Sequence, residues 1–65
     1  MKNKIEQIRR EREIRQEDFA KIMGVSRQTI SSLENGRYNP SIFLAHKISA
    51  YFGMSIEDVF IFEED

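Results

Sequence analysis

Two adjacent polar side chains, Arg27 and Gln28, carry hydrogen-bonding groups that suit the edges of DNA bases. A guanidinium can donate to both O6 and N7 of guanine, and a glutamine amide can bond both N6 and N7 of adenine. Both residues lie in the run QEDFAKIMGVSRQTISSLEN, residues 16–35, which indicates two short amphipathic helices joined by a tight turn. The chemistry that this run predicts is DNA binding.

Catalytic and metal-binding chemistry has little support. The sequence has no cysteine, which excludes a disulfide framework and a Cys-based zinc site. Its one histidine, His46, is not accompanied by clustered carboxylates, and the serines at 31, 32 and 49 lack a matching base for nucleophilic attack. We therefore expect neither an enzyme nor a cofactor or metal site.

Basic and acidic residues divide along the chain, although the net charge is only −1. All ten Lys and Arg residues fall in residues 1–47, which carry +4, whereas residues 48–65 carry −5. Because DNA binding needs a basic face and not a basic total, this division is compatible with it. With 65 residues, 40% of them hydrophobic, we expect a single domain over residues 1–65. The absence of a signal peptide or a membrane-spanning apolar run leads us to expect a cytoplasmic protein.

The pattern of apolar residues, caps and glycines predicts an all-α fold, a compact bundle of five helices. Ser26, Ser41 and Ser55 are suited to cap helix starts, and Gly24 and Gly53 are suited to end helices. The expected helices cover about residues 3–13, 16–23, 27–34 and 41–52, followed by a very short one after Ser55.

The two helices of the 16–35 run match the requirements of a helix-turn-helix. Such helices cross steeply, so a small residue is needed where they meet, and Ala20 occupies that place. Gly24 lies in the turn, and apolar residues at regular positions hold the pair against a core, namely Phe19, Met23, Val25, Ile30 and Leu33. A simple helical hairpin satisfies some of these requirements, but all of them in register favour a helix-turn-helix.

The strings RQED-F-A, VSRQTIS-LE-G and NPS-LA-KI resemble the Cro/repressor-type helix-turn-helix family, also called the xenobiotic-response-element family, over nearly the whole chain. The resemblance implies a lambda-repressor-like fold in which the third helix enters the major groove. It implies base reading by Arg27, Gln28 and Ser32. It also implies contacts with phosphate or backbone by a second group, namely Gln16, Thr29, Ser31, Asn35, Arg37 and Tyr38.

The resemblance further implies a structural salt bridge between Arg9 and Glu34, which would join the first and third helices. One position departs from the family pattern: Arg15 stands where Ser or Thr usually caps the second helix. A lost cap costs about 1 kcal/mol of stability.

The C-terminal segment has more apolar residues than a short fifth helix can bury. Ile56 and Phe60 are four residues apart, so we expect an exposed stripe that forms a dimer interface together with Asn39 and Pro40. The same segment can instead pair as a short strand, residues 60–63 with residues 1–4, or remain a frayed tail.

These features together predict a homodimeric, sequence-specific regulator of transcription that binds double-stranded DNA, with repression as the favoured mode. A dimer would place two recognition helices about 34 Å apart over a near-palindromic operator. We expect no sensor domain, since the helices account for the sequence. Two alternatives use the same fold: the antitoxin of a toxin–antitoxin pair, and a protein–protein adaptor that has lost DNA binding.

Overall fold

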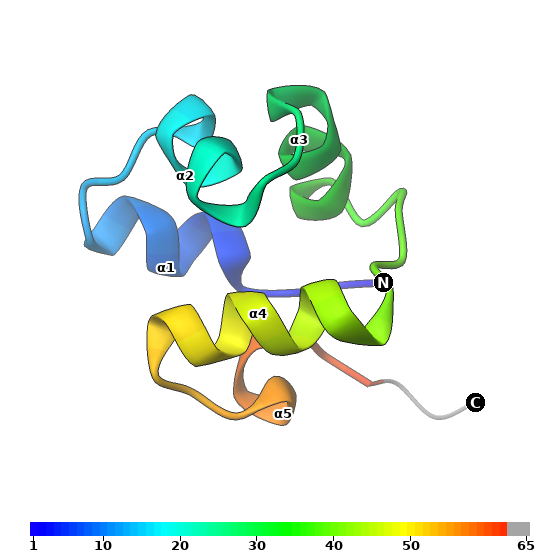
Figure 1. Ribbon diagram of the computed structural model, residues 1–65. Coiled ribbons are helices and arrows are strands. Elements are labelled where there is room, and N and C mark those ends of the chain that lie inside the picture. The colour runs from blue at the N-terminus through cyan, green and yellow to red at the C-terminus, as the bar shows by residue number, and fades with distance from the viewer. Residues whose placement is uncertain (63–65) are drawn as a thin grey trace.

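Five α-helices follow one another in residues 1–62, the part of the chain that the computed structural model describes (Figure 1). They are α1 (Ile5–Glu11), α2 (Gln16–Met23), α3 (Arg27–Glu34), α4 (Ile42–Phe52) and α5 (Ile56–Val59). This arrangement confirms the predicted all-α fold with five helices. The first helix is shorter than the expected 3–13, because Asn3 pairs with another segment and Glu13 leaves the helical conformation with a φ of 58°.

The predicted serine caps are all present. The hydroxyls of Ser26, Ser41 and Ser55 each accept a hydrogen bond from the backbone N–H three residues further on, at 3.1, 3.1 and 3.2 Å. Gly24 ends α2 with a φ of 75°, a conformation that glycine adopts without steric cost. Local sequence therefore sets where α2 ends and where α3 begins, and this places the turn between them.

The connection between α1 and α2 is held by other means. Arg15 is the N-terminal cap of α2, and its side chain makes no capping hydrogen bond, as its departure from the family pattern predicts. Its guanidinium lies 3.2 Å from the Asp18 carboxylate instead. The carbonyl of Ile14 accepts a bond of 2.8 Å from Nη1 of Arg9, so a side chain of α1 fixes this loop.

Apolar side chains from all five helices meet in one core. Phe19 of α2 is fully buried and stacks on Phe52 of α4, with ring centroids 5.3 Å apart. Ala20 is 2% exposed, as expected for the small residue of a close helix crossing. Arg12 lies at the edge of the core, where its guanidinium donates to the Phe52 carbonyl at 2.7 Å and lies over the Phe52 ring. The core thus holds α2 and α4 together. It also buries one face of α3, and the other face of that helix is exposed to solvent.

Residues 2–4 pair with residues 59–61 beside α5. Asn3 and Phe60 form an antiparallel bridge, flanked by hydrogen bonds from Lys4 N–H to Val59 O (2.8 Å) and from Ile61 N–H to Lys2 O (2.9 Å). The expected pairing of residues 1–4 with 60–63 is therefore present as a single bridge. Residue 63 lies outside the described part of the chain.

One expectation at this end is wrong. Phe60 is only 1% exposed, so its side chain belongs to the core and is not part of an exposed stripe with Ile56. The reason is that α5 ends at Val59 and Phe60 adopts an extended conformation, with φ −105° and ψ 137°. The four-residue spacing places two side chains on one face only while a helix continues.

None of the helices in residues 1–62 is long and apolar enough to cross a membrane.

Candidate nucleic-acid interface

The exposed face of α3 carries the predicted base-reading residues. Arg27 and Gln28 occupy the first turn of the helix and are both exposed, whereas Ile30 and Leu33 on the opposite face are fully buried. No acidic residue lies in this first turn. Figure 1 shows α3 at one end of the molecule and the acidic helix α5 at the other. The surface that would face DNA is thus separated from the carboxylates of α5.

Several predicted residues gather around one shallow hollow. It has a volume of about 250 Å³ and is lined by Ser26, Gln28, Thr29, Ser32 and Tyr38. Two predicted base-reading residues thus lie beside the same hollow, Gln28 on the first turn of α3 and Ser32 on the second. Thr29 already shares a hydrogen bond of 2.9 Å with the Ser26 hydroxyl, so its own hydroxyl helps to shape the start of α3.

Arg27 points away from this hollow and toward α2. Its Nη1 donates to Oε1 of Gln16 at 3.3 Å, and Nε2 of Gln16 donates in turn to Oε1 of Glu34 at 2.8 Å. The Gln16 amide is therefore occupied by protein groups on both sides. As the first residue of α2, Gln16 still has a backbone N–H without a partner inside the helix, which suits an anion such as phosphate.

Glu34, which accepts from Gln16, also belongs to a buried ion pair. Nε of Arg9 lies 2.8 Å from Oε2 of Glu34 and Nη2 lies 3.2 Å from Oε1, so the two planar groups meet side by side. The two side chains are 8% and 3% exposed. The contact between Arg9 and Glu34 expected from the family resemblance is thus present, and it joins α1 to the last residue of α3.

The other residues that are predicted to contact the DNA backbone lie beside or beyond the hollow. Ser31 is half-buried on α3, Asn35 caps the end of α3, and Arg37 follows in the loop with an exposed side chain. Tyr38 is 43% exposed and lines the hollow. The structure therefore places Tyr38 with Gln28 and Ser32, but Ser31, Asn35 and Arg37 do not line that hollow.

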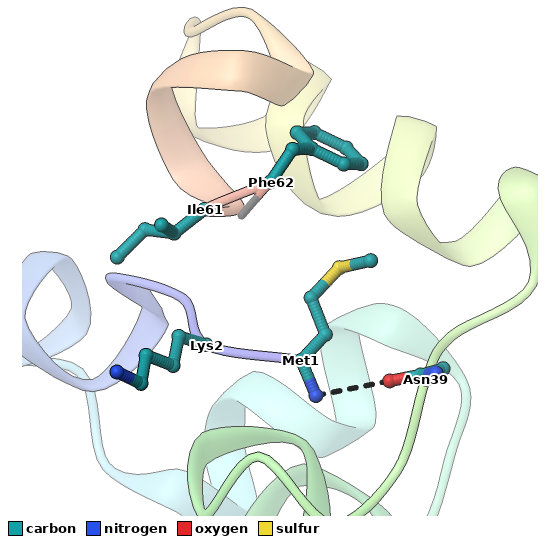
Figure 2. Close-up of a pocket in the computed structure, with 5 residues that line it drawn as sticks. All are labelled: Met1, Lys2, Asn39, Ile61 and Phe62. Atoms are coloured by element: carbon teal, nitrogen blue, oxygen red, sulfur yellow. Dashed lines mark hydrogen bonds between the residues drawn. The ribbon is translucent and has the colours of Figure 1, made fainter. Parts of the chain in front are cut away.

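Long-range contacts that sequence reasoning missed hold the loop after α3. The Met1 amino group donates to Gly36 O at 2.9 Å and to Oδ1 of Asn39 at 3.0 Å, a contact drawn in Figure 2. The Asn3 amide donates to Leu33 O at 2.7 Å, so the first residues of the chain brace the end of α3. No local motif marks these contacts, because their partners are separated by thirty or more residues.

The residues predicted for a dimer interface lie near one another but in two places. Pro40 and Ile56 line an apolar hollow of about 240 Å³, to which Phe60 contributes from the core. Asn39 lines a neighbouring hollow with Met1 and Phe62, and Figure 2 shows the side chains around it. Two exposed apolar side chains also line the apolar hollow beside Pro40 and Ile56: Ile42 is 74% exposed and Phe62 is 58% exposed.

No cluster of metal-binding side chains accompanies these surfaces. Within residues 1–62, no three His, Cys, Asp or Glu residues gather so that they could hold a metal ion. The interface on α3 consists instead of amide, hydroxyl and guanidinium groups, which recognise other molecules through hydrogen bonds.

Comparison of the sequence with known proteins shows the family to which the chain belongs. The helix-turn-helix family model matches residues 5–59. An HTH-type transcriptional regulator of Methanocaldococcus jannaschii is 54% identical, with 100% of this chain and 98% of the relative covered. The HTH-type transcriptional regulator YgzD of Bacillus subtilis is 45% identical over 100% of this chain and 98% of its own length. Control protein C.MunI of a Mycoplasma species is 37% identical, covering 89% of this chain and 80% of that protein. The chain therefore belongs to the Cro/repressor-type helix-turn-helix family.

Proposed function

We propose that this protein is a sequence-specific, DNA-binding regulator of transcription that inserts α3 into the major groove. The observation that carries the proposal is the two-sided character of α3. Ile30 and Leu33 are fully buried, whereas Arg27 and Gln28 extend from the first turn into solvent. The relatives of similar length that are named as HTH-type transcriptional regulators support the same function.

The contacts would divide into two kinds. Arg27, Gln28 and Ser32 would read bases, with Arg27 directed to guanine and Gln28 to adenine. Phosphates would be held by the backbone N–H of Gln16 and by polar groups around α3, namely Thr29, Ser31, Asn35, Arg37 and Tyr38. Contacts of the second kind position the protein on the duplex without specifying sequence.

We further propose that two copies bind as a homodimer through the surface around Pro40 and Ile56, with Asn39 at its edge. The exposed apolar side chains of Ile42 and Phe62 next to this hollow support the proposal, since water contact with such groups is unfavourable. Two-fold symmetry would set the recognition helices about 34 Å apart over a near-palindromic operator. Repression is the mode that fits best, because a dimer in two successive major grooves excludes other proteins from that site.

Selection of bound sequences from a random pool of double-stranded DNA tests the proposal most directly. We expect a recovered motif with two inverted half-sites, and an affinity that falls steeply as salt rises because bound phosphates release counterions. Arg27→Ala and Gln28→Ala should each remove the preference at one base pair of the half-site. Arg10→Ala, which removes an equal charge from an exposed position on α1, serves as the control. An affinity that does not depend on salt would refute the proposal.

The dimer is tested separately by sedimentation equilibrium. Ile56→Asp places a charge in the apolar hollow and should shift the equilibrium toward monomer by tenfold or more, on the order of 1.4 kcal/mol. Glu57→Gln, at an exposed neighbouring position, should leave the equilibrium unchanged. A wild-type protein that stays monomeric at all concentrations, also on DNA, would exclude the homodimer while leaving DNA binding intact.

A further inference from the structure

The Gln16 side chain connects the exposed residue Arg27 to the buried ion pair of Arg9 and Glu34. Arg27 donates to Gln16, Gln16 donates to Oε1 of Glu34, and Arg9 donates to both oxygens of the Glu34 carboxylate. Exposure decreases along this series, since Arg27 is exposed, Gln16 is half-buried and the Glu34 side chain is 3% exposed. A group in the protein interior is thus linked to a group that would touch DNA.

The chemistry of the end groups determines how the Gln16 amide is oriented. A carboxylate only accepts hydrogen bonds, and a guanidinium only donates them, whereas an amide does both. Glu34 therefore attracts the Gln16 nitrogen, and the Gln16 oxygen is turned toward Arg27. The reversed amide would place two acceptors together on one side and two donors together on the other. Only one of the two orientations is compatible with both neighbours.

We propose that Glu34 is a positioning residue for base recognition, because it fixes the Gln16 amide so that an oxygen atom faces Arg27 and holds its guanidinium in place. This inference rests on the proposed function and deepens it. The Glu34 carboxylate then has two tasks. It pairs with Arg9 in the interior, and through Gln16 it selects the position from which Arg27 reads a base.

The geometry leaves Arg27 free to bind a base while it is held. A guanidinium has five N–H groups, and the contact with Gln16 uses only one of those on Nη1. The others remain available for bidentate bonding to guanine. Holding a long, flexible side chain before DNA arrives reduces the conformational freedom that it loses on binding. The expected benefit is therefore stronger discrimination at the base that Arg27 reads.

The replacement Glu34→Met tests this role with an unbranched side chain of similar length. Oε1 of Glu34 accepts from Nε2 of Gln16 at 2.8 Å and from Nη2 of Arg9 at 3.2 Å, whereas Oε2 accepts from Nε of Arg9. Methionine has no oxygen that could accept from the Gln16 amide, so nothing at position 34 fixes which end of the amide faces Arg27. The Gln16 oxygen is then no longer held toward Arg27, and the guanidinium is released.

The measured quantity is a ratio of affinities for two DNA duplexes. They differ only at the guanine whose preference disappears in Arg27→Ala. Because both affinities come from the same preparation, the fraction of folded protein cancels in the ratio. Loss of stability alone therefore cannot change it. Gln16→Met, which removes the amide but keeps the ion pair, forms the second arm. Arg9→Lys, which weakens the ion pair but keeps the Glu34 carboxylate, is the control.

We expect Glu34→Met and Gln16→Met each to lower the ratio about three- to tenfold, a part of the whole discrimination that a bidentate guanine contact provides. The double variant should lower it no further than the larger single effect, and Arg9→Lys should leave it unchanged. Unchanged ratios in both single variants, or an equal loss in Arg9→Lys, would overturn the role of Glu34 while DNA binding stands. A wild-type protein without any sequence preference would instead overturn the proposed function itself.

Discussion

Removal of Arg9 should destabilise the protein more than most single substitutions. In Arg9→Met the side chain keeps its apolar stem but loses three hydrogen bonds, two to Glu34 and one to Ile14 O, with lengths of 2.8, 3.2 and 2.8 Å. Glu34 is 3% exposed, so its charge remains buried and keeps only the bond from Gln16. Breaking a buried pair from one side costs about 3–5 kcal/mol. A chain of this length has a total stability of about 3–10 kcal/mol, so much of the stability is lost.

Urea denaturation followed by far-ultraviolet circular dichroism measures this loss. We expect the midpoint for Arg9→Met to fall by at least about 1 M, with an unchanged dependence on denaturant. The double variant Arg9→Met with Glu34→Met removes both charges and should be more stable than Arg9→Met alone, because no buried charge is left without a partner. A midpoint that falls by less than about 0.3 M in Arg9→Met would refute the reasoning. So would a double variant as unstable as the sum of both single ones.

Three further predictions concern positions where the structure departs from what local sequence favours. Phe60→Ala should lower stability by about 3–5 kcal/mol in urea denaturation because the ring is buried, whereas the matched change at Phe43, which is 84% exposed, should alter it little. Ser49→Ala should raise the thermal midpoint slightly, since its buried hydroxyl has no hydrogen-bond partner among the described residues; a lower midpoint would reveal a partner. Glu13→Gly should stabilise the protein by up to about 1 kcal/mol, because a φ of 58° strains a side chain but not glycine, and an unchanged or lower midpoint in urea would contradict this.

The helix ends that were predicted well depend on short-range interactions. Ser26 caps α3 through a bond to the N–H three residues away, and Gly24 adopts its left-handed conformation at the end of α2. Both features follow from the residue and its nearest neighbours, so they can be inferred without knowledge of the rest of the fold. The turn between α2 and α3 was predictable for this reason.

Phe60 shows where the same reasoning fails. Its spacing from Ile56 predicts a shared helical face, but the chain leaves the helix after Val59 and Phe60 pairs with Asn3 at the other end of the sequence. A strand partner at this distance gives no signal in a local window. The predicted interface on this stripe was therefore wrong for Phe60, although Ile56 remains partly exposed beside the apolar hollow.

The candidate site was predictable in its composition but not in its connections. Arg27 and Gln28 are exposed on α3, as their position on the polar side of an amphipathic helix indicates. The contact of Arg9 with Glu34 was expected only through resemblance to a family. The link from Glu34 through Gln16 to Arg27 spans eighteen and then eleven residues, and no spacing rule predicts it.

Residue types and their spacing are enough to predict the elements of this protein: five helices, their serine caps, the turn at Gly24, and a third helix with one apolar and one polar face. These depend on interactions within about one helical turn, which residue types specify directly. The packing of the helices against one another sets which side chains meet across the core, that Phe60 lies inside it, and that Glu34 reaches Arg27 through Gln16. Such contacts arise when all the helices pack together, so their partners depend on the whole fold and not on any one segment.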